Sequence, residues 1–481
     1  MILQTLKMSL FRVFFVCLFC HLAPLCAQEL PANVVQSLQK VHVMPESMGV
    51  YVQEISPNSS SGVPLISWRA NAPMQPASTM KLVTSYAALD MLGAGYAWKT
   101  SVYMTGHLDG DVLVGDLILQ GGGDPHLVLE NFWTLLRQIR AKGIREIQGN
   151  LVIDNAWMEP QVFDAAEFDG DPTRPYNVGP DPMLVNFNVL SLVLRPDGNS
   201  LRVESQTPLA LQSAVNVTLV SGACGDWRSK LTPTFSLVNQ QIKINLSGSY
   251  PLGCEEKTWM LQPYPLSHGD YVGVLFRGLW KELGGQLDGN VVPGVVPVAA
   301  QPVTDMQSEP LPDILRDMNK YSNNVMARLV MLTLDKEAAQ SPANAQRAAQ
   351  LTQLWFARLG IEAEGLQLDN GSGLSRNARI SPAQMGRMLN HAFASTVMPE
   401  FMASLPLLGV DGTMQKRAAS LSVAGHAHLK TGGLEGVRNF AGYLQAVSGR
   451  RYVIVCFVND KNARQTEAAQ DELMQWVYDH G

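Results

Sequence analysis

The apolar residues of this sequence change their spacing twice along the chain. Helical spacing is found over residues 78–92, 313–334, 345–359 and 381–392. Between about residue 100 and residue 302 it largely vanishes, and short apolar strands separated by Gly, Asn and Pro take its place, over residues 113–119, 149–153, 189–194, 215–220 and 241–246. We therefore expect the two ends of the chain to form one α/β domain that carries a strand-rich insertion of about 200 residues.

The C-terminal part supplies strands and a helix for this domain. Residues 439–447 and 451–458 alternate like two strands joined through Ser448-Gly449, which is a hairpin signal, and residues 49–55 predict a further strand. The third helix of the C-terminal half begins with Ser381, Pro382 and Gln384, which form a capping box. A last helix over 465–480 is acidic, whereas a helix that lies on a membrane surface is basic.

The charge of the chain excludes one class of partner. There are 36 Lys and Arg against 42 Asp and Glu, which gives a net charge of −6. Binding to phosphate backbones needs clustered positive charge. We therefore expect no nucleic-acid partner.

The first 27 residues differ from the rest. Lys7 and Arg12 precede a run over 13–25 that is apolar except for His21, and Ala27 provides a small residue for cleavage. The run is short for a membrane span, which needs about 20 residues. We interpret residues 1–27 as a signal peptide, and expect a secreted or periplasmic protein with at most peripheral membrane association.

Three cysteines lie beyond this segment. Cys224 and Cys254 are 30 residues apart in similar Gly-containing contexts, and an exported chain meets an oxidising compartment. We expect a disulfide between them, with a stabilisation of ~3 kcal/mol. Cys456 lies in an apolar strand and is interpreted as an inert core thiol.

Metal and cofactor chemistry have little support in the sequence. It contains no His-Glu-x-x-His, and its histidines are scattered. An acidic cluster could bind calcium, but a solvated loop is the favoured interpretation of Asp164, Glu167, Asp169 and Asp171. We expect neither a metal nor a cofactor.

A candidate nucleophile stands at the start of the first predicted helix. Ser78 and Lys81 are separated by three positions, which places both side chains on one helix face, so the amine can take the proton of the hydroxyl. A Ser-x-x-Lys pattern is common by chance. A second one, Ser37 to Lys40, is interpreted as a solvated helix face.

Two further short motifs follow in the C-terminal half. Ser322-Asn323-Asn324 falls within the helix predicted from Asp313, and Lys430-Thr431-Gly432 precedes the strand predicted at Asn439. Lys-Thr-Gly occurs once in the chain, and a Gly-rich strand edge can admit a substrate backbone.

The order of these three motifs resembles the active-site triplet of penicillin-recognising serine enzymes. Ser322 lies 244 residues after Ser78, and an insertion of this size resembles the class C low-molecular-mass penicillin-binding proteins, the D-alanyl-D-alanine carboxypeptidase/endopeptidase family. The resemblance runs from about residue 40 to the C-terminus and includes residues 121–125, 149–154, 369–376 and 409–413.

The resemblance implies a multi-domain fold. Its core is an α/β (α+β) peptidase domain with an antiparallel sheet flanked by helices, and it carries large nested strand-rich insertions. We expect the divisions to be residues 28–99 with 303–481 for the peptidase domain, 100–164 with 284–302 for an inserted domain, and 165–283 for a second nested domain.

The resemblance also implies a reaction and a role for each motif. Ser78 would attack a D-alanyl carbonyl of a peptidoglycan stem peptide and form an acyl-enzyme. Lys81 would be the base, so its pKa must fall from about 10.4 towards neutrality through burial and the nearby Lys430. Ser322 would pass the proton to the leaving amine, and Asn324 would hold the substrate amide.

Further contacts are implied for the substrate. Lys430 with Thr431 would receive the terminal carboxylate, and Gly432 lies in the same strand edge. The oxyanion would lie between the N–H groups of Ser78 and Gly433. Relatives commonly carry Ser or Thr where this chain has Gly433, so one hydroxyl is missing.

A pocket for the diamino acid of the stem peptide is implied as well. By motif its members are Asp154, Arg376 and Leu434. An acid and a base suit a zwitterionic diaminopimelate end, with Asp154 on the amine and Arg376 on the carboxylate. The expected partners are peptidoglycan stem peptides, with β-lactams as covalent inhibitors.

Two other functions stay open at this point. Tyr321-Ser322-Asn323 also fits the Tyr-x-Asn of class C β-lactamases, which makes a serine β-lactamase or esterase the alternative enzyme. A non-catalytic cell-wall binding protein is the alternative from another class.

Overall fold

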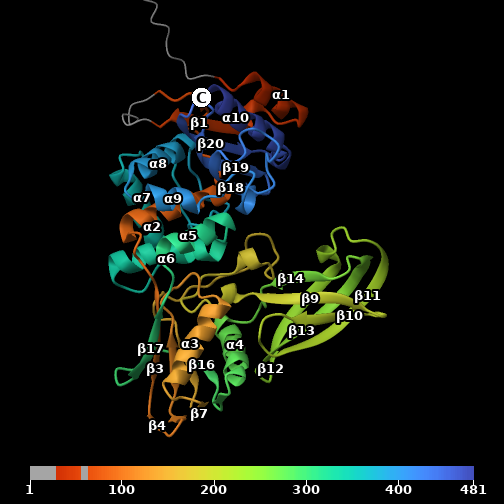
Figure 1. Ribbon diagram of the computed structural model, residues 1–481, viewed down its shortest axis with the longest axis vertical. Coiled ribbons are helices and arrows are strands. Elements are labelled where there is room, and N and C mark those ends of the chain that lie inside the picture. Colours follow the sequence, from red (N-terminus) through yellow and green to blue (C-terminus); the bar gives the residue numbers. More distant parts are fainter. Residues whose placement is uncertain (1–28, 56–62) are drawn as a thin grey trace, which may run out of the picture.

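The computed structural model describes residues 29–55 and 63–481, so the predicted signal peptide lies outside the described residues. The chain forms an elongated body with a strand-rich unit projecting from its side (Figure 1). In the part of the chain that is described, none of the helices has the length and apolar character that a membrane crossing requires.

Both ends of the chain build one antiparallel sheet. Its strand order is β18-β19-β20-β1-β2, with bounds Ala427–Leu434, Val437–Gln445, Arg451–Asn459, Met48–Glu54 and Ile66–Trp68. The predicted strand at 49–55 and the predicted hairpin are confirmed as β1, β19 and β20.

Helices cover both faces of this sheet. Alternate residues of β20 point to opposite sides, so Ile454 and Cys456 pack with α1 and α10, while Val453 and Val455 pack with the helices of the other face. The helix bounds are α1 Ala32–Lys40, α2 Met80–Leu92, α5 Leu311–Lys320, α6 Asn324–Ala339, α7 Ala345–Arg358, α8 Pro382–Ala394, α9 Met398–Ser404 and α10 Glu467–His480. An antiparallel sheet flanked by helices, interrupted by a long strand-containing insertion, confirms the predicted fold class.

The single helix predicted over residues 313–334 is two helices in the structure, α5 and α6. The chain leaves the helical conformation after α5 because Ser322 has a φ of 59°, and Asn323 then caps α6 by accepting a hydrogen bond from the Met326 N–H. The expectation that Ser322 lies inside a helix is therefore wrong. In contrast, the capping box predicted at Ser381 and Gln384 is present at the start of α8.

The insertion begins and ends in one sheet. Strand β3 brings the chain in and β17 takes it out, and the two are antiparallel neighbours in the order β16-β8-β6-β3-β17. The bounds are Val291–Gly294, Leu151–Asp154, Leu117–Gln120, Lys99–Met104 and Gln301–Gln307. A smaller sheet, β15-β7-β5-β4, has the bounds Gln286–Leu287, Glu146–Ile147, Val112–Val114 and His107–Asp109. The single strand predicted over 113–119 is therefore two strands, β5 in this sheet and β6 in the larger one.

Two helices of the insertion contradict the expectation that helical spacing largely vanishes there. They are α3, Leu129–Ala141, and α4, His268–Glu282, and Figure 1 shows them beside the sheet. The buried residues of α3 are Phe132, Leu135, Leu136 and Ile139. These positions follow the i, i+3, i+4, i+7 spacing, so the signal was present in the sequence.

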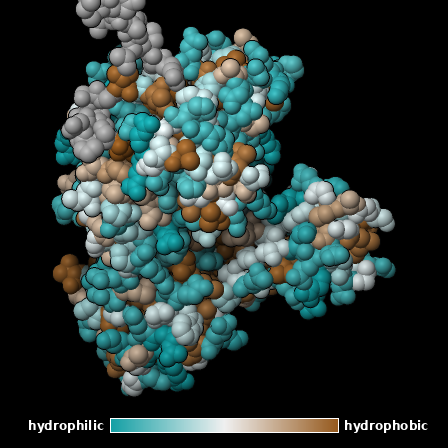
Figure 2. All heavy atoms as spheres, turned by 45° about the horizontal axis from the view of Figure 1, so that its top comes forward, coloured by the Kyte–Doolittle hydropathy of each residue, from teal (hydrophilic) through white to brown (hydrophobic). Residues whose placement is uncertain are grey.

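The projecting unit consists of two three-stranded sheets. They are β10-β9-β14, with bounds Ser200–Ser205, Leu190–Asp197 and Lys257–Leu261, and β11-β13-β12, with bounds Leu211–Ala223, Gln241–Gly253 and Leu231–Val238. The predicted disulfide between Cys224 and Cys254 is present. Figure 2 shows a hollow between this unit and the body. A cleft of about 1070 Å³ is lined by residues of the unit, such as Trp259, and by Arg174 and Tyr176 of the preceding segment. The domain divisions given above stay predictions.

Candidate active site

The candidate nucleophile Ser78 lies in a tight turn, Ala77–Thr79, directly before α2. Ala77 has a φ of 47°, a conformation that costs energy for a residue with a side chain. Gln75 stabilises the turn, because its Oε1 accepts a hydrogen bond of 3.0 Å from the Ala77 N–H. The hydroxyl of Ser78 therefore projects from a fixed backbone.

Two glycines, Gly373 and Gly432, pack closely against the backbone of this turn. A Cβ at Gly373 would lie 1.8 Å from the Ala77 carbonyl oxygen, and a Cβ at Gly432 would lie 2.6 Å from the Pro76 carbonyl oxygen. Only glycine permits such close approaches of backbone to backbone. Gly432 thus brings β18 against the nucleophile turn.

Lys81 is fully buried and makes three polar contacts. Its Nζ lies 3.1 Å from Ser78 Oγ, 2.7 Å from Asn324 Oδ1 and 2.7 Å from the Ser372 carbonyl oxygen. Burial, followed by the positive charges of Lys430 and Arg328, lowers the pKa of Lys81 well below its usual value.

The partners of Lys81 fit a neutral amine. The amide oxygen of Asn324 and the carbonyl of Ser372 can only accept, so they take the two N–H bonds of the amine. In the neutral amine, the lone pair is then left for the Ser78 hydroxyl, which can donate to it. This arrangement is that of a base next to a nucleophile.

A second lysine lies on the other side of the site. Lys430 is also fully buried, and its Nζ donates to Ser322 Oγ at 2.9 Å and to the Thr431 carbonyl at 2.8 Å. Burial lowers the pKa of Lys430 to about 7. Thr431 Oγ1 in turn donates to Thr413 Oγ1 at 2.8 Å. The Lys-Thr-Gly motif precedes the strand at Asn439, now β19, as expected, but the motif itself also lies in a strand, β18, which was not predicted.

The structure brings the members of the three motifs together through these contacts. Sequence reasoning missed three groups that contact them: the carbonyls of Ser372 and Tyr176 and the hydroxyl of Thr413. The two carbonyls have no side-chain signature. For Ser372, the flanking Gly371 and Gly373, both with positive φ, were the available signal.

The second Ser-x-x-Lys pattern is not a solvated helix face as expected. Ser37 is buried in α1, and its hydroxyl donates to Glu472 of α10 at 2.8 Å. Cys456 is buried in β20, where burial raises the pKa of its thiol to about 12, in agreement with the interpretation as an inert core thiol.

The residues predicted for the diamino-acid pocket have separate surroundings. The buried Asp154 carboxylate accepts hydrogen bonds from Gln120 Nε2 and from the N–H groups of Ala156 and Val296, all within the insertion. Arg376 is exposed and stacks on Phe168 at 4.7 Å. Leu434 ends β18.

Within residues 29–55 and 63–481, no group of three or more His, Cys, Asp or Glu side chains is arranged to hold a metal ion. The acidic residues Asp169 and Asp171 instead pair with Arg174.

Known proteins resemble this chain in sequence over most of its length. The chain is 26% identical over 449 residues to the D-alanyl-D-alanine carboxypeptidase DacB of Haemophilus influenzae, which covers 91% of this chain and 90% of that protein. It is 27% identical over 419 residues to a D-alanyl-D-alanine carboxypeptidase of Actinomadura sp. strain R39, with 82% and 74% covered.

The fold matches that of solved relatives. The crystal structure of penicillin binding protein 4 from Haemophilus influenzae superimposes with a TM-score of 0.78 at 23% identity, over 94% of this chain and all of that one. The same protein complexed with a novel β-lactam gives a TM-score of 0.74 at 22% identity, with the same coverage. The model of one family, D-Ala-D-Ala carboxypeptidase 3, matches residues 30–479. The chain therefore belongs to the D-Ala-D-Ala carboxypeptidase 3 (S13) family.

Proposed function

We propose that this family member hydrolyses D-alanyl bonds of peptidoglycan stem peptides, as carboxypeptidase, endopeptidase or both, through an acyl-enzyme on Ser78. The observation that carries the assignment of Ser78 is the 3.1 Å contact to Lys81, whose two other contacts are acceptors. An amine so placed has one direction left for its lone pair, and that direction is the Ser78 hydroxyl.

The reaction proceeds in two halves. Ser78 Oγ attacks the carbonyl carbon of the penultimate D-alanine while its proton passes to Lys81. The C–N bond breaks, the proton held by Lys81 passes through Ser322 to the leaving amine, and the terminal residue departs. Water then attacks the acyl carbon while its proton passes to Lys81. The bond to Ser78 Oγ breaks, Lys81 returns the proton to Ser78, and the shortened peptide is released.

The second lysine supports the polar steps. Its Nζ donates to Ser322, so its charge favours a hydroxyl that releases a proton to the amine. Thr431, which is half-buried beside it, presents its hydroxyl to the substrate's terminal carboxylate, and the ammonium charge of Lys430 attracts that carboxylate. The N–H groups of Ser78 and Gly433 hold the oxyanion, and Asn324 and Gly432 line the site beside the substrate amide.

The same nucleophile accounts for inhibition by β-lactams, which acylate it covalently. The complex of the Haemophilus influenzae relative with a β-lactam supports this proposal. The disulfide and the signal peptide predicted over 1–27 support a location outside the cytoplasm, in the periplasm or secreted.

The diamino-acid end of the stem peptide is proposed to meet Asp154, Arg376 and Leu434. The exposed guanidinium of Arg376, near the end of β18, supports a contact with a substrate carboxylate. The Asp154 carboxylate already accepts hydrogen bonds within the insertion, so its contact with the substrate amine stays a prediction.

The alternative enzyme, a β-lactamase or esterase with Tyr321 as base, has weaker support. The Tyr321 side chain is 75% exposed, whereas the neighbouring Ser322 accepts the hydrogen bond of Lys430. A base needs a fixed position next to the nucleophile, so Ser322 is the better relay.

The test is release of D-alanine from a synthetic pentapeptide ending in D-Ala-D-Ala. We expect release by the wild type and none by Ser78→Ala. The matched control is Ser37→Ala, which removes the serine of the other Ser-x-x-Lys pattern and leaves the rate unchanged. Equal release by Ser78→Ala and wild type would refute the assignment of the nucleophile.

A further inference from the structure

A segment of the insertion lies directly against the catalytic groups. This segment, residues 163–177, is called the arm here. Its contacts with the peptidase domain come from three places along its length: the Tyr176 carbonyl accepts a hydrogen bond of 3.1 Å from Asn324 Nδ2, the Phe163 ring lies 4.9 Å from the guanidinium of Arg328, and Phe168 stacks on Arg376. The arm is therefore docked along the site rather than at one point.

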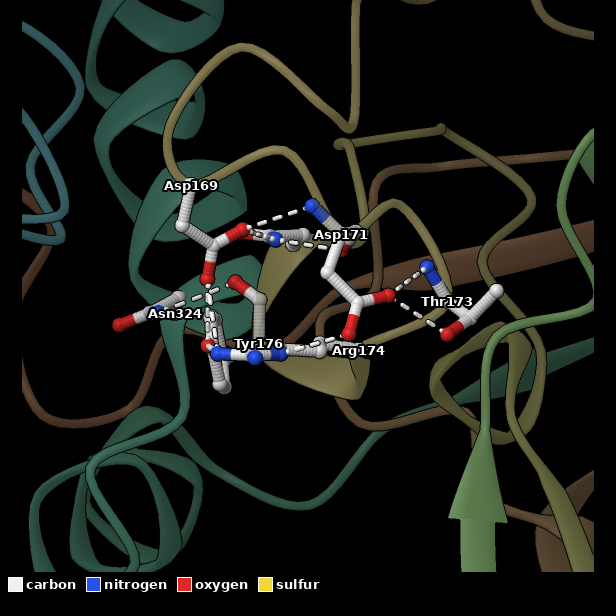
Figure 3. A network of polar contacts seen from close by, with 7 residues as sticks. Asp169, Asp171, Thr173, Arg174, Tyr176 and Asn324 are labelled. Atoms are coloured by element: carbon white, nitrogen blue, oxygen red, sulfur yellow. Dashed lines mark hydrogen bonds and ion pairs between the residues drawn. The ribbon is translucent and has the colours of Figure 1, made fainter. Parts of the chain in front are cut away.

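The end of the arm next to Asn324 is held by a network of charged hydrogen bonds, shown in Figure 3. Asp169 accepts from the Tyr176 hydroxyl at 2.5 Å, from Arg174 at 3.1 Å and from Asn177 at 2.7 Å. Asp171 accepts from Arg174 at 2.8 Å and from Thr173 at 2.7 Å. Arg174 thus bridges two carboxylates.

These bonds favour the charged form of Asp169. Burial alone would raise the pKa of Asp169, but the hydrogen bonds from Tyr176 and Asn177 outweigh it and hold the pKa below its usual value. Charge-assisted hydrogen bonds of this kind are stronger than neutral ones. The hydrogen bonds that Arg174 and Asn177 donate to Asp169 therefore fix the backbone on both sides of the Tyr176 carbonyl.

The carbonyl of Tyr176 determines which way the Asn324 amide faces. A carbonyl can only accept, so the NH₂ group of Asn324 must face it. The amide oxygen is then turned towards Lys81, 2.7 Å away. With the amide reversed, its NH₂ group would face Lys81 and compete with the Ser78 hydroxyl for the lone pair of the amine.

We propose that the arm is a positioning element for catalysis: Asp169 and Arg174 hold the Tyr176 carbonyl, which orients the Asn324 amide so that Lys81 directs its lone pair at Ser78. This inference rests on the proposed function, because it assumes that Ser78 is acylated. It gives the insertion a part in the chemistry, although none of its side chains enters the reaction. Asp169 and Arg174 are positioning residues in this scheme.

The test measures acylation of Ser78 by a chromogenic cephalosporin, with the noncovalent dissociation constant and the acylation rate constant determined separately. Asp169→Ala and Arg174→Gln are expected to lower the acylation rate constant about tenfold and to leave the dissociation constant within about twofold. Arg174 is suited as the second variant because its side chain is 49% exposed, so its replacement is compatible with folding even if that of Asp169 is not.

A matched control lies in the same insertion. Arg195 and Glu256 form an exposed ion pair between Nε and Oε2 at 2.7 Å, in the projecting unit. Glu256→Ala removes one carboxylate from an Arg–carboxylate pair, as Asp169→Ala does, and should leave both constants unchanged.

A double-mutant cycle separates positioning from general loss of structure. In an Asn324→Ala background there is no amide left to orient, so Arg174→Gln should change the acylation rate constant by less than about twofold. Equal tenfold effects in both backgrounds, or wild-type acylation by both arm variants, would overturn the proposal. A wild type that is not acylated at all would refute the proposed function itself, which is a different result.

Discussion

At the scale of single residues, the site is defined by two buried lysines, each given a separate task by its partners. Lys81 faces the nucleophile, and Lys430 faces Ser322. The first contact could be predicted from the sequence because Ser78 and Lys81 are three positions apart, in a helical turn that leads directly into α2. The second joins residues 108 positions apart, so it followed only from the resemblance to a family.

The carbonyls of Ser372 and Tyr176 could not be predicted in the same way. Every residue has a carbonyl, and its direction depends on the backbone conformation rather than on the residue type. The sequence therefore predicted most of the side chains that meet around Ser78, but it missed the Thr413 hydroxyl and the main-chain acceptors that orient the site.

The pKa of Lys430 predicts a pH dependence. With a pKa of about 7 in the free enzyme, Lys430 is charged below this pH and neutral above it. The positive charge attracts the carboxylate of a penicillin, so the second-order rate constant of acylation should fall as the pH rises through about 7. Stopped-flow kinetics across pH 5.5–9, roughly the range over which such a group titrates, measures this rate constant. Lys430→Met should be slow and lack this alkaline limb. An unchanged limb in the variant would exclude Lys430 as its origin.

Position 433 predicts a gain of affinity. A Cβ at Gly433 would meet no atom nearer than 3.8 Å, so Gly433→Ser fits without rearrangement. The added hydroxyl can donate to a substrate carboxylate, which should tighten the noncovalent complex with a penicillin by about threefold, while the acylation rate constant stays the same. Titration before acylation measures it, and weaker binding by Gly433→Ser would contradict the prediction.

At the scale of elements, the site depends on how closely β18 approaches the turn that carries Ser78. Elements with strong local signals were predicted well, such as the capped helix α8 and the hairpin of β19 and β20. The break between α5 and α6 was missed because Ser322 adopts a positive φ that its residue type does not announce. Strand β18 was missed as well. Its Thr-Gly-Gly sequence has poor strand propensity, and its pairing with β19 overrides this.

The close approach predicts a sharp difference between neighbouring glycines. A Cβ at Gly432 would lie 2.6 Å from the Pro76 carbonyl oxygen, so Gly432→Ala must push β18 away from the nucleophile turn. A displacement of this order reduces rates by about a hundredfold. Acylation by penicillin measures the loss. Gly433→Ala, one position along the same strand, is the control and should stay within about twofold of the wild type. Similar rates for both variants would argue against the packing role of Gly432.

At the scale of the whole molecule, the sequence predicted a domain built from both chain ends around a long insertion. That followed from the change in apolar spacing, since each type of element requires its own period. The contact between the arm and Asn324 could not be predicted, because it joins residues 148 positions apart through a main-chain carbonyl. The insertion thereby reaches the active site, while its projecting strands lie away from it (Figure 1).

The disulfide belongs to this projecting part and predicts a loss of stability without a loss of chemistry. Cys224 and Cys254 close a loop of 30 residues. Replacing both by Ala should lower the unfolding free energy of the unit by ~3 kcal/mol. Acylation at Ser78 should be unchanged. Urea unfolding and acylation of the same double variant measure both, and a large loss of acylation would show that the unit shapes the site.

The most direct test of the central assignment is time-resolved intact-mass spectrometry of the purified protein after brief exposure to penicillin, with Ser78→Ala in parallel. We predict a lasting adduct of one penicillin per chain on the wild type and none on Ser78→Ala. A short-lived adduct with rapid turnover of the drug would favour the β-lactamase alternative instead. An adduct on both proteins, or none on the folded wild type, would contradict Ser78 as the nucleophile.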